Sequence, residues 1–404
     1  MTLADKVRAA VDAAPVVDLH THLFAPQFGA LNLWGIDELL TYHYLVAETL
    51  RTEPSVTPEA FYARTKKEQA DLVWESLFVK RSPLSEACAG VLTVLDAFNL
   101  KDLGEARDFY AGRTVEQHLE DVLRLAGVEA LTMTNDPCDP AERAVWDAGT
   151  QPDPRFYAAL RLDRLLPIGG RQGGGSVLGQ RTQGKEEDLR KTLDLWIARM
   201  RPRYLAISVT EVEAPPQAVL GACRDHNLPF AMMIGVRRAV NPRLQAAGDG
   251  MSVVDLSHLE RLTESNPDVR FLVTTLAREN AHGLCVVARK FANVLPFGCW
   301  WFMNQPSLVE DTTLMRLEML GPTFVPQHSD ARILDQLIYK WRHSRKAIAN
   351  ALIRRYEAMS VRPTDAQIDR DAKDLMSGIA REWLASPLSP GGSSWGEGPG
   401  VRGS

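Results

Sequence analysis

The chain has 404 residues, of which 45% are hydrophobic and 24% charged, and its formal net charge is −5. This composition is typical of a folded globular protein and excludes disordered, collagen-like and disulfide-stapled chains. The net negative charge, without a basic stripe or tail, argues against nucleic-acid binding, and no apolar run reaches the roughly 18 residues of a membrane-spanning helix.

Short apolar, β-rich runs alternate along the chain with polar, helix-forming stretches. Continuous apolar strands separated by helix-length segments are typical of a parallel sheet that is buried on both faces. Eight such runs match the strand number of a (β/α)8 barrel, so we predict an α/β fold of the TIM-barrel class. The predicted strands are residues 16–23, 127–136, 155–163, 203–210, 229–236, 269–277, 293–301 and 323–331.

The segment between the first two predicted strands is too long for a simple βα unit. Residues 33–115 are rich in helix formers, and we predict a helical insertion that roofs the active site at the end of strand 1. Residues 1–385 are predicted to form a single domain, followed by a disordered Gly/Ser/Pro-rich tail over 386–404. The Gly-rich residues 169–184 lack the P-loop pattern and predict an ordinary loop.

The strongest candidate site lies at the ends of the first and last predicted strands. The sequence D-L-H-T-H occupies residues 18–22. Residues two apart on a strand face the same side, so His20 and His22 point together into the barrel mouth and can hold one divalent metal ion. Asp330 can complete that metal site or take a proton from a substrate, and Arg332 suits a carboxylate or a developing oxyanion. The alternative interpretation is a set of unrelated polar residues at strand ends.

Polar and aromatic residues also follow the other predicted strands and would line the same mouth. Cationic and amide donors suit an anionic, polyhydroxylated ligand, and tryptophan offers a platform for a sugar face. Taken singly, each is more often a turn residue, a loop salt bridge or a core residue. The candidate substrate-binding residues are Asn135, Asp136, Arg161, Arg238, Arg278, Trp300, Trp301 and His328, the last because it lies two residues before Asp330.

Other chemistry finds no support in the sequence. No predicted strand is followed by a G-x-S-x-G elbow or a G-x-G-x-x-G dinucleotide fingerprint, and there is no S-x-x-K, which speaks against serine hydrolysis and NAD binding. The five cysteines are scattered without C-x-x-C spacing, and the N-terminus has no long apolar region. These features favour a cytoplasmic location.

Eight segments of the chain, taken in order, resemble motifs of the uronate (glucuronate) isomerases, a divergent branch of the amidohydrolase superfamily of metal-dependent barrels. V-V-D-L-H-T-H-L at 16–23 resembles the opening H-x-H of that family, and L-N-L-W at 31–34 followed by His43-Tyr44 resembles its insertion with D-H-Y. Six later segments resemble T-D-D-P, R-P-D, I-G-A-L-R-N-N-N, R-D-N, F-G-S-G-W-W-F and T-D-S-R of the family. They are T-N-D-P at 134–137, R-L-D at 161–163, I-G-V-R-R with Asn241 at 234–241, R-E-N at 278–280, F-G-C-W-W-F at 297–302 and S-D-A-R at 329–332.

The resemblance implies a barrel with a helical roof and one divalent metal ion, most commonly zinc, with manganese as the alternative. It implies interconversion of an aldose and a ketose uronate, with a small sugar acid as substrate and a homo-oligomeric enzyme. Asp330 would move the proton between C1 and C2, while Arg332 and Tyr44 would hold substrate oxygens and His43 would join the substrate-binding set. A proton beside a carbonyl becomes acidic when a metal or cation stabilises the developing enediolate.

The chain departs from the family pattern at several positions. The family's His before I-G-A-L-R is Met233, its S-D-H-A after strand 4 is S-V-T at 208–210, and its Arg after D-H-Y-K-W is Ala47. A thioether is a poor zinc ligand beside imidazoles, so His328 or His43 would have to supply a missing ligand. Two alternatives stay open: a hydrolase, lyase or decarboxylase of the same superfamily, and a non-catalytic barrel scaffold.

Overall fold

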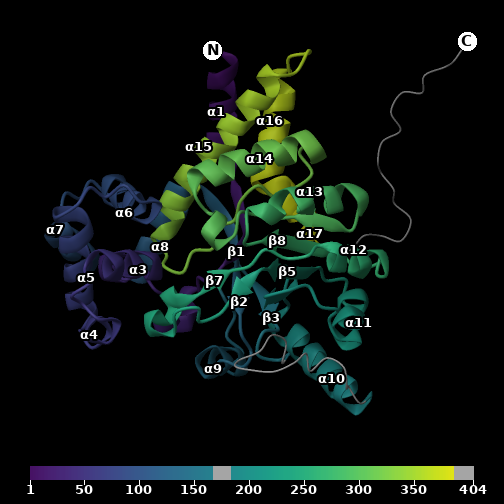
Figure 1. Cartoon of the computed structure of the whole chain (residues 1–404), viewed down its shortest axis with the longest axis horizontal. Coiled ribbons are helices and arrows are strands. Elements are labelled where there is room, and N and C mark those ends of the chain that lie inside the picture. Colours follow the sequence, from purple (N-terminus) through teal and green to yellow (C-terminus); the bar gives the residue numbers. More distant parts are fainter. Residues whose placement is uncertain (167–182, 386–404) are drawn as a thin grey trace, which may run out of the picture.

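The computed structural model describes residues 1–166 and 183–385. The predicted tail over 386–404 and nearly all of the predicted Gly-rich loop over 169–184 lie outside these described residues. Figure 1 shows a central parallel sheet surrounded by helices, with a further lobe of helices on one side.

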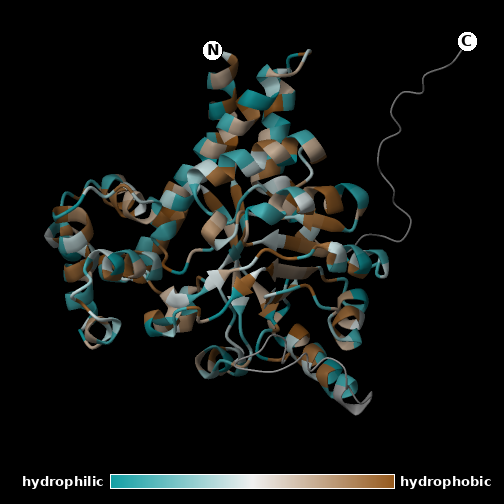
Figure 2. Cartoon of the chain, viewed as in Figure 1, coloured by the Kyte–Doolittle hydropathy of each residue, from teal (hydrophilic) through white to brown (hydrophobic). Residues whose placement is uncertain are grey.

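The centre of the fold is a seven-stranded parallel sheet in the order β1-β2-β3-β4-β5-β8-β9. Its strands are β1 (Val16–Thr21), β2 (Val128–Asn135), β3 (Phe156–Arg161), β4 (Leu205–Val209), β5 (Phe230–Ile234), β8 (Phe271–Thr275) and β9 (Val294–Pro296). Nearly all strand residues are buried, and Figure 2 shows the strands as largely hydrophobic. Burial on both faces is what helices packed outside a curled parallel sheet require. β6 (Val236–Arg237) and β7 (Gly250–Met251) form a separate antiparallel pair.

The eighth predicted strand is replaced by an irregular extended segment. Val325 donates to the Pro296 carbonyl at 3.1 Å, and its own carbonyl accepts from the Gly298 N–H at 2.8 Å, next to β9. Further along, the Asp330 N–H donates to the carbonyl of His20 on β1 at 3.1 Å. One segment is therefore bonded to both edge strands, and the fold is TIM-barrel-like.

Two local features explain why this segment is not a regular strand, contrary to the prediction over 323–331. Pro326 has no N–H to donate to a strand ladder. Asp330 adopts a φ of 53°, in the left-handed region that interrupts extended backbone. The run is apolar enough to predict a strand, but these two residues prevent regular pairing.

Helices before, between and after the strands cover the outside of the sheet (Figure 1). They are α1 (Leu3–Ala13), α9 (Pro140–Asp147), α10 (Gln183–Met200), α11 (Gln217–Asp225), α12 (Ser257–Glu264), α13 (Glu279–Lys290), α14 (Pro306–Leu320), α15 (Gln336–Glu357), α16 (Asp365–Lys373) and α17 (Ile379–Leu384). Short 3-10 or π turns are η1 (Pro26–Leu31), η2 (Glu75–Val79), η4 (Pro242–Gly248), η5 (Trp301–Met303) and η6 (Asp374–Gly378). Helix α15 begins at Gln336, in the stretch after residue 332 whose apolar residues recur at helical spacing.

The segment between β1 and β2 is helical, as predicted. It holds α2 (Ile36–Leu40), α3 (His43–Thr52), α4 (Pro58–Tyr62), α5 (Lys66–Trp74), α6 (Glu86–Ala97), α7 (Leu103–Ala111) and α8 (Val115–Ala126). Capping boxes start α5 at Thr65 and α8 at Thr114. Helices α6 and α8 pack against α15, which joins the helical lobe to the barrel (Figure 1).

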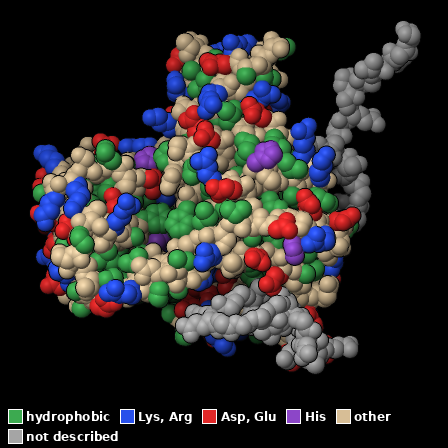
Figure 3. All heavy atoms as spheres, in the orientation of Figure 1, with side chains coloured by type: hydrophobic (Ala, Val, Ile, Leu, Met, Phe, Trp, Pro, Cys, Tyr) green, Lys and Arg blue, Asp and Glu red, His purple; other side chains and the backbone are tan. Residues whose placement is uncertain are grey.

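The barrel interior is filled by an apolar cluster that includes Leu19, Met233, Leu272 and Phe297. A larger cluster lies between the strands and the helices. Within the described residues, no helix is long and apolar enough to cross a membrane. Figure 3 shows acidic and basic side chains interspersed over the visible face, with hydrophobic side chains gathered where the helical lobe meets the barrel.

Candidate metal centre

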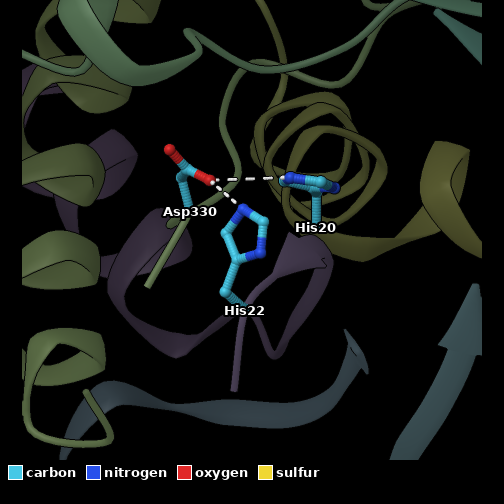
Figure 4. A group of neighbouring side chains, drawn as sticks. All are labelled: His20, His22 and Asp330. Atoms are coloured by element: carbon cyan, nitrogen blue, oxygen red, sulfur yellow. Dashed lines mark ion pairs between the residues drawn. The ribbon is translucent and has the colours of Figure 1, made fainter. Parts of the chain in front are cut away.

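Three of the predicted site residues lie together at the end of β1 (Figure 4). His20 lies on β1, His22 follows it, and Asp330 comes from the segment that closes the barrel. Nε2 of His20 and Nε2 of His22 lie 3.5 and 3.3 Å from Oδ1 of Asp330. Ligand atoms of the three residues all lie within 4.8 Å of one another, and no other such group occurs in the described part of the chain.

The hydroxyl of Tyr204 orients the ring of His20. It donates to the carbonyl of Leu19 at 2.9 Å, and Nδ1 of His20 lies 3.4 Å from it. A hydroxyl has one proton to donate, so the second interaction requires a proton on Nδ1 of His20. The lone pair of His20 is then on Nε2, the nitrogen that faces Asp330.

Thr134, on β2, does the same for His22. Its hydroxyl donates to the carbonyl of Thr21 at 2.5 Å and lies 3.1 Å from Nδ1 of His22. The proton of His22 therefore sits on Nδ1 and its Nε2 carries the lone pair. Partners that occupy the far nitrogen in this way fix the tautomer and the orientation of metal-binding histidines.

The charges at the centre favour cation binding. Burial raises the pKa of Asp330, but when His20 and His22 are protonated their hydrogen bonds and positive charge outweigh burial and hold that pKa well below its usual range. Burial and the positive charge of Arg332 hold the pKa of His22 well below its usual range, against the opposing effect of Asp330. An ionised carboxylate beside a neutral imidazole is the protonation state that binds a metal ion.

Asp18 holds the closing segment against β1. Its carboxylate accepts from the backbone N–H of Ser329 at 3.1 Å and from the indole N–H of Trp341 at 2.9 Å. Ser329 is the neighbour of Asp330, and Trp341 lies on α15. Asp18 thus ties β1, the closing segment and α15 together directly behind the three candidate ligands.

The donor atoms at the centre fit a divalent ion. Nε2 of His20 and Oδ1 of Asp330 are buried, and neither has a hydrogen-bond partner within the described residues. Buried polar atoms normally have partners, so these two point to a ligand between them. Two imidazole nitrogens and a carboxylate oxygen are a donor set that divalent transition metals accept. His20, His22 and Asp330 could therefore hold a metal ion.

Aromatic residues at the start of α3 bring the insertion to the same site. The rings of Tyr42, His43 and Tyr44 pack together, with centroids 4.2 to 4.9 Å apart. Burial lowers the pKa of His43 to about 3, with a further contribution from Arg332 and an opposing one from Asp330. The insertion and the closing segment thus contribute to one site.

Arg332 reaches this site from the end of the closing segment. Its backbone N–H donates to Oε1 of Gln336 at 2.8 Å, which fixes the turn into α15. Its side-chain Nε is buried without a hydrogen-bond partner among the described residues. The guanidinium charge acts on both His22 and His43, so Arg332 has an unused donor close to the centre.

Solved structures of other proteins share this fold. The chain is similar to the crystal structure of a uronate isomerase from Bacillus halodurans C-125, with 47% sequence identity and a TM-score of 0.88 over 95% of this chain and 96% of that chain. This chain belongs to the uronate isomerase family.

Two more distant structures share the fold. A uronate isomerase from Thermotoga maritima is 17% identical with a TM-score of 0.76 over 95% of this chain and 97% of that chain. A glucuronate isomerase from Caulobacter crescentus is 14% identical with a TM-score of 0.72 over 94% of this chain and 93% of that chain. No protein-family model and no curated protein matched the chain.

In this uronate isomerase family member, His328 lies beside the candidate metal centre but outside its group of three candidate ligands. It is fully buried, and its ring centroid is 5.1 Å from that of His20. Neither ring nitrogen has a hydrogen-bond partner among the described residues. A Cβ at Gly298 would lie only 1.9 Å from Cδ2 of His328, so glycine is needed under this ring. The structure does not place His328 as the replacement ligand for Met233.

Both predicted tryptophans, Trp300 and Trp301, are buried in the barrel-interior cluster, which is the core-packing alternative. Only Trp301 also contacts the aromatic rings of the insertion among the ring contacts of the described residues. Trp301 lies 5.8 Å from the ring of His43, and the guanidinium of Arg238 lies 5.9 Å from the Trp301 ring. Arg238 also pairs with Asp249 at 2.7 Å. Trp301 therefore joins the aromatic group of the insertion, while Arg238 covers it from outside.

The polar residues after β2 and β3 form a second group. Asn135 is buried with its Oδ1 unpartnered among the described residues, and its Nδ2 donates to Glu142 at 3.1 Å. Asp136 pairs with Arg164 at 3.2 Å, while Arg161 is 3.4 Å from Asp163. The exposed residue Arg278 lies apart, at the N-terminal end of α13.

Sequence patterns gave no reason to select Tyr204, Tyr42 or Glu142. Tyr204 precedes β4 and reaches His20 only because the strands curl into a barrel. Thr134 is part of T-N-D-P, but that motif drew attention to Asn135 and Asp136. Only its place on a strand could have pointed to Thr134. Thr21 of β1 pairs with Met133, so Thr134 lies next to the strand that carries the H-x-H motif.

Proposed function

We propose that this protein interconverts the aldose and ketose forms of a hexuronate or a related sugar acid. The observation that carries the proposal is the His20–His22–Asp330 group at the end of β1 in a member of the uronate isomerase family. We propose zinc as the bound ion, with manganese as the alternative. When bound by these three residues, such an ion would polarise the substrate carbonyl and stabilise negative charge on its oxygen.

Asp330 is proposed to move the proton between C2 and C1. Its Oδ1 lies between the two imidazoles, and Figure 4 shows its other carboxylate oxygen pointing away from them. In its ionised form this carboxylate is the base that would accept a proton from the carbon beside the carbonyl. Return of that proton to the neighbouring carbon, together with transfer of the C2 hydroxyl proton to the oxygen on C1, completes the isomerisation.

Arg332, Tyr44 and His43 are proposed to hold substrate oxygens. Arg332 has an unused, buried Nε donor and a permanent positive charge that suits a developing oxyanion. Tyr44 and His43 approach from α3, and Nε2 of His43 is also buried without a partner among the described residues. The second polar group, which includes Asn135 and Arg161, is proposed to bind the distal hydroxyl and carboxylate groups of the sugar acid.

The test is isomerase activity with glucuronate and galacturonate in D₂O. We expect ketose formation accompanied by exchange of the C2 proton with solvent, and about one metal ion per chain by elemental analysis. Asp330→Asn should lose both exchange and turnover, because an amide cannot accept the proton. If metal-loaded wild-type protein neither forms a ketose nor exchanges the C2 proton, the proposal is wrong.

A further inference from the structure

A buried lysine lies behind Tyr44. Lys340, on α15, is 3% exposed, and its Nζ lies 3.3 Å from Oε1 of Glu86 on α6. The same Nζ lies 5.8 Å from the centroid of the Tyr44 ring and 5.2 Å from that of Tyr339. A buried ammonium group is costly unless it is paired, so this arrangement needs an explanation.

Tyr44 is partly buried and packs against several aromatic rings. The Tyr42 ring lies 4.9 Å and the His43 ring 4.6 Å away, and Phe302 is stacked at 6.4 Å. Burial holds the pKa of Tyr44 well above its usual value, and the neighbouring negative charges act in the same direction. Lys340 is the cation that faces the Tyr44 ring within the distance of a cation–π contact.

The three residues of this contact come from three separate elements. Tyr44 lies on α3, Glu86 begins α6, and Lys340 lies on α15, which follows the closing segment directly. Helices α6 and α15 approach so closely that a Cβ at Gly90 of α6 would lie 2.7 Å from the ring of Tyr339 on α15. The contact therefore joins the insertion to the helix that continues from Asp330 and Arg332.

We propose that Lys340 is a positioning residue that sets Tyr44 relative to Asp330 and Arg332. Its ammonium group holds the face of the Tyr44 ring from α15, and Glu86 neutralises the buried charge from α6. This inference rests on the proposed function, because Tyr44 is assigned to the substrate only for that reaction. A pair needed only for helix docking could be replaced by neutral side chains without loss, since buried ion pairs contribute little net stability.

The test compares four variants: Lys340→Met, Glu86→Gln, the double variant of both, and Arg342→Met as the matched control. Arg342 pairs with Asp96 at 2.9 Å and joins the same two helices, but on the exposed surface. We expect Lys340→Met to lower kcat about 10- to 100-fold with KM changed less than about twofold, because a misplaced group costs rate. The double variant should stay equally slow although no charge is left unpaired, while Glu86→Gln and Arg342→Met should change kcat less than about threefold.

A second measurement follows Tyr44 directly. Protein labelled with ¹³C at tyrosine Cζ gives a Tyr44 signal that is assigned by its loss in Tyr44→Phe. We expect this signal to move in Lys340→Met and in the double variant, but not in Arg342→Met. Metal content should be unchanged in all of these variants.

The two measurements separate the two proposals. If the double variant regains wild-type kcat, or if the Tyr44 signal is unmoved in Lys340→Met, the positioning role of Lys340 is wrong and the pair serves only helix docking. If wild-type protein shows no isomerase activity but the Tyr44 signal responds to Lys340→Met, the proposed reaction is wrong and the Lys340–Tyr44 contact is supported.

Discussion

Two hydroxyl groups orient the candidate metal ligands of this protein. Tyr204 and Thr134 each donate to a backbone carbonyl of β1 and thereby accept from Nδ1 of the adjacent imidazole. Because each hydroxyl has only one proton, the backbone carbonyl decides the histidine tautomer. The ligand set is thus specified by side chains that need not contact the ion.

Thr134→Val should weaken metal binding about 10- to 100-fold, because the isosteric side chain removes the acceptor for His22 Nδ1. Competition with a chromogenic chelator measures the affinity. Thr132→Val is the matched control, since Thr132 lies on the same strand, is buried, and has no partner for its hydroxyl among the described residues. Equal affinities for Thr134→Val and wild type would contradict the role assigned to this hydroxyl.

Glu142 makes the free energy of unfolding depend on pH near neutrality. It accepts from Asn135 Nδ2 at 3.1 Å and from the Asp136 N–H at 3.0 Å, and burial raises its pKa to about 7. A raised pKa for an acid means that the protonated form is favoured by folding. Its stabilising effect is complete below the unfolded-state pKa and is lost as the pH rises through about 7.

Glu142→Gln should therefore make the unfolding free energy less dependent on pH between about 4.5 and 8. The wild type should lose up to about 3 kcal/mol relative to the variant across this range, at about 1.4 kcal/mol for each pKa unit. Urea denaturation at a series of pH values measures this difference. Parallel pH curves for the two proteins would show that the Glu142 carboxyl titrates normally in the folded state.

At the scale of elements, a buried carboxylate fastens the insertion to the barrel. Asp335, just before α15, accepts from the Tyr110 hydroxyl at 2.5 Å, from His118 Nε2 at 2.8 Å and from the Gly35 N–H at 2.9 Å. Burial raises the pKa of Asp335, but His118 and the hydrogen bonds lower it below its usual value. The residues that accompany Asp335 belong to three parts of the insertion.

Asp335→Asn should destabilise the fold by about 3–5 kcal/mol, because it leaves a buried His118 without its charged partner. Tyr110→Phe is the graded control and should cost about 1–2 kcal/mol, since it removes one hydrogen bond and leaves the carboxylate in place. Chemical denaturation measures both values. An Asn variant as stable as the Phe variant would mean that charge at this junction is unimportant.

The sequence predicted the elements better than their contacts. Seven of the eight predicted strands are present, because strands buried on both faces appear as continuous apolar runs. The eighth run failed as a strand because Pro326 and the positive φ of Asp330 act against an otherwise suitable composition. Helices between β1 and β2 were predictable from segment length and helix formers alone.

The sequence also predicted that His20, His22 and Asp330 lie together, because the strand ends meet at one face of a barrel. It could not identify Tyr204 or Lys340. Their contacts join elements far apart in the chain, and neither residue lies in a recognisable motif. Hydroxyl partners and buried ion pairs depend on side-chain directions in the folded barrel, which one sequence does not show.

At the scale of the whole molecule, the candidate metal centre lies where β1, the closing segment and the insertion come together. A ligand that binds only this folded arrangement adds to its stability by mass action. Removal of the ion by a chelator should therefore lower the melting temperature of wild-type protein. The same treatment should leave His20→Ala/His22→Ala unchanged, and differential scanning calorimetry with metal re-addition checks both outcomes.

The irregular segment that closes the barrel has a geometric consequence for the site. In a regular strand, side chains alternate strictly between the two faces, so only every second residue can serve the mouth. The segment from Val325 to Arg332 leaves that alternation at Asp330, whose left-handed backbone re-aims the chain. Residues two apart in this segment therefore need not point the same way. Asp330 reaches both imidazoles, and His328, two residues earlier, stays outside the group of candidate ligands. In an irregular segment of this kind, the side chain that points to the site can change without forcing the neighbouring side chains to the opposite face.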